Sequence, residues 1–462
     1  MTEQAKFLKG NLLRHITVMS LTASIGLMAI FVVDLVDMIF ISMLGKAELA
    51  AAVGYAGAIL FFTSSFGIGV SIAAGALVAQ SLGAGHTDQA RRRATNALIY
   101  GVIFGAAFAA IVWLNLRSLS ALMGARGPTL EMSVAYLQII VPSLPFLLVG
   151  MVGGAILRAH GDAKRSMTAA VLGGLVNAAL DPILIFGLDL ELAGAALASV
   201  AARITMGVAV VISVVRHHGG FPRPSWQSLR MDLTPVAVIA VPAILTQLAT
   251  PIGQAYVTRS MAEFGEAAVA GMAIIARITP VAFGVIFALS GAIGPVIGQN
   301  HGAGYHDRVR DAFRDGIVFT AVVVVAMSAV LFLMRPLLAE VFDLDGVALT
   351  LVFLFAGPLS LLFFFNGVIF VSNAAFNNLG HPFYSTWINW GRNTLGTIPF
   401  VALGAFWFGA PGVLIGQFAG GVVFALVAFA ISQRVLAKQL ETDEKDPFAT
   451  QSKLHQLFHL RR

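Results

Sequence analysis

The motif QSLGAGHTDQAR at residues 80–91 returns in altered form as QNHGAGYHDRVR at residues 299–310. Gln, Gly, Ala, Gly, Asp and Arg occupy the same places in both copies, and Gln299 stands 219 positions after Gln80. Each copy follows a long apolar run. The glycines are suited to ending that run, and Asp88 is suited to capping a short following helix. A motif repeated at one fixed distance indicates two copies of one structural unit.

Other positions extend this repeat along the chain. The same offset relates Gly161 to Gly380, and Asn177 corresponds to Asn393 with a small drift. If each half has an even number of membrane spans, both halves keep one orientation and are related by an axis along the membrane normal. We expect four regions: an N-terminal lobe at 1–215, a cytoplasmic linker at 216–233, a C-terminal lobe at 234–436 and a cytoplasmic tail at 437–462.

The apolar runs are long enough to cross a membrane. Of the 462 residues, 58% are hydrophobic and 11% are charged, less than half the charge of a typical soluble chain. A spanning helix needs about 20 apolar residues. The sequence therefore predicts an all-α, polytopic membrane protein with twelve transmembrane helices in two pseudo-symmetric six-helix lobes. The predicted spans lie near 15–43, 47–80, 94–116, 131–157, 166–188, 192–215, 234–262, 267–298, 315–334, 346–376, 383–408 and 411–433.

The basic residues lie mainly on one side of these spans. Counting loops and termini, 21 lysines and arginines fall on the side of the N-terminus and four on the other side. Basic residues are retained in the cytoplasm, so both termini are predicted to be cytoplasmic in a bacterial inner membrane. The net charge of +6 follows from this topology, and we expect no nucleic-acid partner. The lack of cysteine excludes disulfides and thiolate metal sites.

Acidic residues inside two of the spans are candidates for function, because ionisable groups are costly in a bilayer. Asp34 and Asp37 are three positions apart in the first span and share one helix face. Asn177 and Asp181 are four positions apart in the fifth span, and Pro182 interrupts the helix directly after them.

Ser199, in the sixth span, is expected at the same depth as Asp37 and Asp181, in the outer half of the bilayer. Asp37, Asn177, Asp181 and Ser199 would form an oxygen-rich site, suited to Na⁺ or to a carboxylate pair that shares a proton. Asp34 either lines a cavity or only polarises Asp37. An alternative structural interpretation is that Asp37 or Asp181 simply forms an ion pair with Arg203.

Three arginines, Arg203, Arg277 and Arg392, also lie deep in the predicted spans. They either donate hydrogen bonds to carbonyls of broken helices or face a cavity, where they would favour anionic or zwitterionic substrates. Asn366 and Asn373 in the tenth span are further candidates for lining the cavity.

Five motifs occur in order along the chain: DMIFISMLG at 37–45, the QxxGAGxxD loop in two copies, GDAK at 161–164, NxxxDP at 177–182 and GAAxAS at 194–199. Together they resemble the multidrug and toxic compound extrusion (MATE) transporters, along about residues 12–436. The resemblance implies two six-helix lobes and export of drug-like compounds, small organic cations or zwitterions, in exchange for protons or sodium ions. Spans seven and ten carry no acid within the membrane, so the chain is more similar to the branch of DNA-damage-inducible protein F. That likeness implies coupling at Asp37, Asn177, Asp181 and Ser199.

Other functions are open at this point. A flippase for lipid-linked sugars would have an arginine-rich cavity and usually two further helices, and a major-facilitator carrier would order the residues after span two differently. An intramembrane enzyme would need paired acids or a nucleophile with a base at one depth, and we expect no enzymatic activity. We also expect a monomer in contact with membrane lipids, a role in antibiotic resistance, and no cofactor besides the coupling ion, H⁺ or Na⁺.

Overall fold

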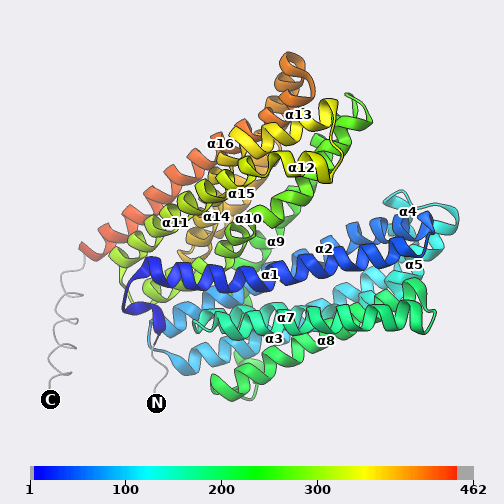
Figure 1. Cartoon of the computed structure of the whole chain (residues 1–462). Helices are drawn as coiled ribbons and strands as arrows, with labels where there is room; N and C mark the ends of the chain where they lie inside the picture. Colours follow the sequence, from blue (N-terminus) through cyan, green and yellow to red (C-terminus); the bar gives the residue numbers. More distant parts are fainter. Residues whose placement is uncertain (1–4, 445–462) are drawn as a thin grey trace, which may run out of the picture.

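The computed structural model describes residues 5–444, and within them the chain is helical with no strand (Figure 1). The predicted tail from residue 445 onward lies outside this range. The first lobe contains α1 (Leu12–Met43), α2 (Ala47–Gly83), α3 (Thr87–Leu114), α4 (Leu116–Leu122), α5 (Gly127–Ile140), α6 (Leu144–Ala159), α7 (Ala163–Pro182) and α8 (Glu191–His217). The second lobe contains α9 (Trp226–Ala262), α10 (Glu266–Gly302), α11 (His306–Leu333), α12 (Arg335–Val341), α13 (Gly346–Leu354), α14 (Phe363–Asn378), α15 (Pro382–Asn393) and α16 (Ile398–Glu444).

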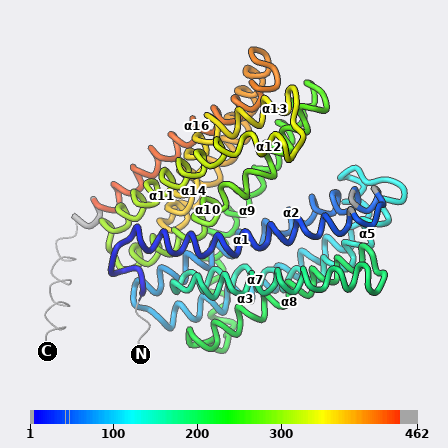
Figure 2. The backbone as a smooth tube through the Cα atoms, viewed as in Figure 1, coloured from blue at the N-terminus to red at the C-terminus, as the bar shows by residue number. Residues whose placement is uncertain are grey.

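Ten helical stretches of the described chain are long and apolar enough to cross a membrane, and the bent pair α13 and α14 (59°) makes an eleventh. The longest stretch, Pro382–Leu440, contains two crossings, because α16 reverses at Gly409 (φ 63°). Only glycine adopts this backbone conformation easily. The two arms of α16 then run so close that a Cβ on Gly404 would overlap the carbonyl oxygen of Gly412. Figure 2 shows the reversal where the orange tube turns back into the red one. The predicted twelve crossings are confirmed.

Two local predictions need correction. The segment between the lobes is shorter than the predicted 216–233, since α8 extends to His217 and α9 begins at Trp226. Ser225 starts α9 with a capping box, in which the Ser225 hydroxyl accepts from Ser228 N at 3.1 Å. No separate short helix follows Asp88, which lies in the first turn of the continuous helix α3.

The helices form two groups, α1–α8 and α9–α16, that meet at one end and diverge at the other (Figure 1). They meet where α1 begins and α16 ends, and they diverge where α4, α5, α12 and α13 lie. Contacts between the groups run from α1 to α10, from α2 to α9 and from α2 to α10. Because α9 and α10 repeat α1 and α2, the interface has the pseudo-symmetry that the motifs indicate.

At the closed end, the repeated motifs hold the lobes together. Gln80 Nε2 donates to the carbonyl oxygen of Asn378 in the second lobe at 2.9 Å, and Gln299 Nε2 donates to that of Ala159 in the first lobe at 2.7 Å. Donors and acceptors are both 219 positions apart, so the two bonds are one contact made twice. We call Gln80, Ala159, Gln299 and Asn378 the glutamine gate.

Two glycines permit this contact. A Cβ on Gly83 would overlap the carbonyl oxygen of Gln299, and a Cβ on Gly302 would overlap that of Gln80. The buried Phe7 donates its backbone N–H to Gln299 Oε1 at 2.8 Å, which links the start of the chain to the same place. The motif therefore does more than cap a helix, because it closes this end of the molecule.

Candidate functional site

The first group of interest lies where α1 packs along α7 in the N-terminal lobe. Asp37 is near the last turns of α1, and Asn177 and Asp181 lie one turn apart near the end of α7. Pro182 has no N–H and interrupts the helical ladder, and a π-helical turn follows at Ile183–Gly187. This break places the buried carboxyl of Asp181 against α1.

The three side chains form one hydrogen-bonded group. Asn177 Nδ2 donates to Asp37 Oδ1 at 2.7 Å and to Asp181 Oδ2 at 2.8 Å. One amide therefore serves both carboxyls and joins α1 to α7. The second oxygen of Asp181, Oδ1, is buried and has no hydrogen-bond partner among the described residues. Asn177 and Asp181 are almost fully buried, with 2% and 0% of their surface exposed. We call Asp37, Asn177 and Asp181 the carboxyl cluster.

The other predicted members lie around this cluster and not in it. Ser199, in α8, makes no hydrogen bond to the cluster among the described residues. Tyr136, a buried residue of α5 that sequence reasoning missed, packs in one core cluster with Ala195 and Ala196 of α8. Asp34 is exposed.

Arg203 does not form an ion pair with the cluster. Its Nη1 donates to the carbonyl oxygen of Ile140 at 3.2 Å and to Ser143 Oγ at 2.9 Å. These acceptors flank the 3₁₀ turn at Val141–Ser143, between α5 and α6. Arg203 therefore donates to a carbonyl oxygen at a helix break, which was one of the two roles considered for the arginines.

The donor set of the cluster fits a proton better than Na⁺. Sodium prefers oxygen ligands, but Asn177 presents its amide nitrogen to both carboxyls. No group of three or more His, Cys, Asp or Glu side chains within the described residues has the arrangement of a metal site. A Na⁺ ion here would require the Asn177 amide to turn its oxygen inward.

A cavity of about 550 Å³ lies mostly against the C-terminal lobe. It is lined by α9, α10, α14, α15 and α16, and it reaches α2 and α6 of the first lobe. Its apolar wall includes Phe287, Phe363 and Phe370, with Phe287 and Phe370 at 5.6 Å between ring centres. Pockets with a largely apolar lining and a few directed polar groups are typical of small-molecule sites.

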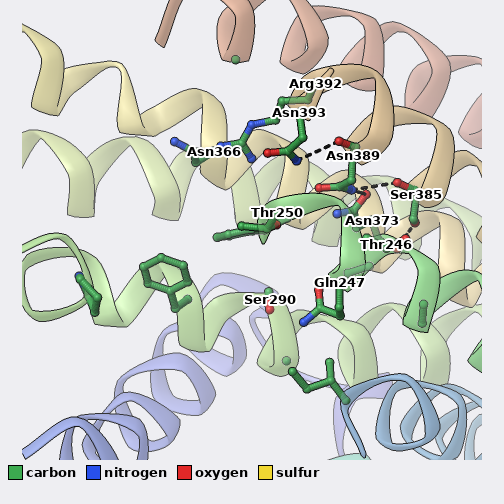
Figure 3. A pocket seen from close by; sticks show the side chains of 18 of the residues that line it. Thr246, Gln247, Thr250, Ser290, Asn366, Asn373, Ser385, Asn389, Arg392 and Asn393 are labelled. Atoms are coloured by element: carbon green, nitrogen blue, oxygen red, sulfur yellow. Dashed lines mark hydrogen bonds between the residues drawn. The ribbon is translucent and has the colours of Figure 1, made fainter. Parts of the chain in front are cut away.

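The polar wall of the cavity is rich in asparagine (Figure 3). Asn389 Nδ2 donates to Asn373 Oδ1 at 3.3 Å, and Asn393 Nδ2 donates to the carbonyl oxygen of Asn389 at 2.9 Å. Asn366 lines the cavity as predicted but forms no hydrogen bond among the described residues. Figure 3 shows Asn366, Asn393 and Arg392 on the same side of the cavity.

The arginines divide between the cavity and other surroundings. Arg392 lines the cavity, whereas Arg203 and the exposed Arg277 do not. Arg158 follows directly after the predicted span 131–157, and the structure places it in the last turn of α6 and in the cavity lining. Its position at the edge of a span concealed this role.

Comparison with known proteins settles the family. The profile of the MatE family matches residues 22–183 and 242–403, once in each lobe. The chain belongs to the MatE family. The two matches begin 220 positions apart, close to the offset of 219 between the repeated motifs.

Relatives of this MatE protein have different described substrates. An FAD transporter of Shewanella oneidensis is 28% identical over 424 residues, which cover 90% of this chain and 93% of the relative. The multidrug export protein MepA of Staphylococcus aureus is 25% identical over 318 residues, which cover 67% of this chain and 69% of MepA.

Solved structures share the fold. A mutant of the MATE transporter VcmN of Vibrio cholerae has a TM-score of 0.87 and 25% identity, covering 92% of this chain and 97% of VcmN. An outward-facing multidrug resistance MATE family transporter has a TM-score of 0.88 and 23% identity, covering 96% and 99% of the two chains. This MatE protein is thus a multi-pass membrane transporter by family and fold.

Proposed function

We propose that this MatE protein is a proton-coupled antiporter that exports small, drug-like organic molecules across the bacterial inner membrane, with both termini in the cytoplasm. The observation that carries the proposal is the carboxyl cluster. Two acids that share one amide donor inside a transmembrane lobe cannot both be ionised at low cost, so one of them holds a proton that can be exchanged. The absence of acids from the lining of the cavity also fits the branch of DNA-damage-inducible protein F.

The position of α1 supports a route from proton binding to transport. This helix contacts α7, which carries Asp181, and also contacts α10 of the other lobe. Protonation of Asp37 changes the charge between α1 and α7, and a shift of α1 is passed to the lobe interface. Alternating access then requires the glutamine gate to open while the divergent end closes.

Uptake of norfloxacin into everted membrane vesicles tests this proposal, with an acid-inside proton gradient and a sodium gradient applied separately. We expect uptake with the proton gradient alone. Asp37→Asn should reduce uptake to background, because an amide cannot exchange a proton. Asp34→Asn, three residues away but outside the cluster, should keep most of it.

Two results would contradict the proposal. Undiminished uptake by Asp37→Asn would remove the cluster from the mechanism. Uptake driven only by sodium would show that the coupling ion is Na⁺.

The arginine-lined cavity supports a second candidate, a flippase for lipid-linked sugars or other lipids. In reconstituted vesicles, translocation of a phosphate-bearing lipid without uptake of norfloxacin would favour this function over antiport.

A further inference from the structure

From the charges in the cavity, we infer that the substrate of this transporter is an organic anion with a flat aromatic part, and that Arg392 binds its phosphate or carboxylate. The inference rests on the proposed export function and specifies the substrate class. It departs from the cationic substrates that the family resemblance implies.

The formal charge of the cavity is positive. Arg158 and Arg392 are its two charged lining residues in the described chain, and no Asp, Glu, Lys or His accompanies them. Neither guanidinium forms an ion pair there. The nearest acids of functional interest, in the carboxyl cluster, are outside the lining. An organic cation would meet repulsion in this cavity without any compensating carboxylate.

Arg392 also lacks the structural role that other arginines of this chain perform. Arg203 donates to the Ile140 carbonyl beside a 3₁₀ turn, and Arg335 donates to the Phe353 carbonyl beside the π-helical break at Phe355–Leu359. Arg392 makes no side-chain hydrogen bond among the described residues. The carbonyls at the end of its helix already have donors, since Gly391 accepts from Gly396 N at 2.8 Å and Arg392 from Thr397 Oγ1 at 2.9 Å. The guanidinium is therefore available to a ligand.

Other polar residues of the cavity lining can add to an anion site. Asn366 and Gln417 both line the cavity with Arg392, and their amides have no hydrogen-bond partner in the described structure. Such amides can donate to the oxygens that a planar guanidinium binds in pairs. The rings of Phe287, Phe363 and Phe370 on the apolar wall offer faces and edges for an aromatic ring system. Arg158, at the end of α6, provides a second positive charge for a substrate with two anionic groups.

A matched pair of fluorescent flavins tests the inference on the purified full-length protein in phosphatidylcholine nanodiscs. Flavin mononucleotide and riboflavin share one flat ring system, and only the former carries a phosphate. We expect flavin mononucleotide to bind about 10- to 100-fold more tightly, the usual effect of a hydrogen-bonded charge pair. Equal affinity of the two flavins, or tighter binding of the cation ethidium, would overturn the inference without any variant.

Arg392→Gln should bring the affinity for flavin mononucleotide close to that for riboflavin, and Arg392→Lys should restore part of the difference. Arg277→Gln removes the same charge from an exposed position outside the cavity and should leave the difference unchanged. If Arg392→Gln is poorly folded, Arg158→Gln serves as the second variant, and we expect it to weaken flavin mononucleotide more than riboflavin. A preference for flavin mononucleotide that survives both Arg392→Gln and Arg158→Gln would contradict the assignment.

A lipid phosphate has the same chemistry as a soluble one. Nanodiscs containing phosphatidylglycerol distinguish them, because unchanged flavin mononucleotide affinity supports a soluble anion and strong competition shows that a lipid headgroup occupies the site. Equilibrium binding requires no gradient, so it is measured separately from transport. If the parent protein binds both flavins equally but still transports norfloxacin, this inference is wrong and the proposed function stands. If it prefers flavin mononucleotide but a proton gradient does not drive norfloxacin uptake, proton coupling is wrong and this inference stands.

Discussion

The N-terminal lobe carries two acids bridged by one asparagine, whereas the cavity wall of the C-terminal lobe carries an arginine and a row of asparagines. Both lobes are built from the same helices in the same order, and the profile of one family matches each of them. In the first lobe, Asn177 joins Asp37 to Asp181. In the second, Arg392 faces the cavity without any acid among the lining residues. The repeated fold therefore supplies a symmetric frame, and each lobe has its own charge and its own chemistry.

The glutamine gate is where the lobes remain alike, so equal changes to it should have equal effects. Gly83→Ala and Gly302→Ala each place a methyl group on the opposite glutamine's carbonyl, and we expect the gate to open. Overpacking of about 1–3 kcal/mol would raise the open population about 5- to 150-fold. The chain has no cysteine, so a single cysteine at Ala76, buried in the cavity lining, reports opening by its rate of thiol labelling.

Gly57→Ala is the matched control for this experiment. Gly57 lies in α2, the helix that contains Gly83, and a Cβ there meets no atom within 4 Å. The control should label at the rate of the parent. Faster labelling in only one of the two gate variants would show that the closed end is not symmetric in energy.

Asn177 and Asn393 are counterparts in the repeat. Replacing each of them tests whether the acidic site of the first lobe depends on its asparagine more than the cavity wall of the second lobe does. Asn177→Ala removes a donor shared by the buried Asp181 and the half-buried Asp37, so we expect a loss of about 1–3 kcal/mol in stability. Asn393→Ala removes only a bond to the Asn389 carbonyl, and we expect about 1 kcal/mol or less. Thermal unfolding in detergent measures both. Equal losses would mean that the carboxyl cluster does not depend on its amide.

The smallest effect on stability should come from substitution of the residues that precede α7 and α15, Asp162 and His381. Asp162 caps α7 by accepting from Arg165 N at 3.2 Å, whereas its counterpart His381 makes no capping hydrogen bond. Burial disfavours the charge of Asp162, but hydrogen bonds from His218 and Arg165 outweigh it and hold its pKa below the usual range. We expect Asp162→Ala to cost about 1 kcal/mol and His381→Ala less.

The lowered pKa gives this prediction a pH dependence. The stabilisation from Asp162 is fully present above its unfolded pKa of about 3.9, and it is lost as the pH falls toward the lower folded value. The difference in melting temperature between the parent and Asp162→Ala should therefore shrink in acid. A difference that stays constant down to pH 3 would contradict the ion-paired cap.

The fold was largely predictable because hydropathy, the positive charges and the repeated motif are properties of the chain itself. Helix spacing likewise placed Asn177 beside Asp181, and the structure joins Asp37 to Asp181 through Asn177. The sequence did not show that Ser199 makes no hydrogen bond to this cluster, because the distance between residues on different helices depends on how the helices pack. The different roles of Arg203 and Arg392 were equally hidden, because both are arginines inside a predicted span. Arg203 binds a backbone carbonyl and Arg392 faces the cavity, and this difference depends on the backbone beside each residue.

The glutamine gate has a consequence for how such a protein can change over time. Each glutamine is held by a backbone carbonyl of the other lobe, at Ala159 and at Asn378. Substitution of either acceptor residue's side chain leaves that carbonyl in place. After a duplication, each half could therefore vary its interior freely while the two halves still recognised each other at the closed end. The divergence of one lobe toward acids and the other toward arginine needed no matching change at their junction.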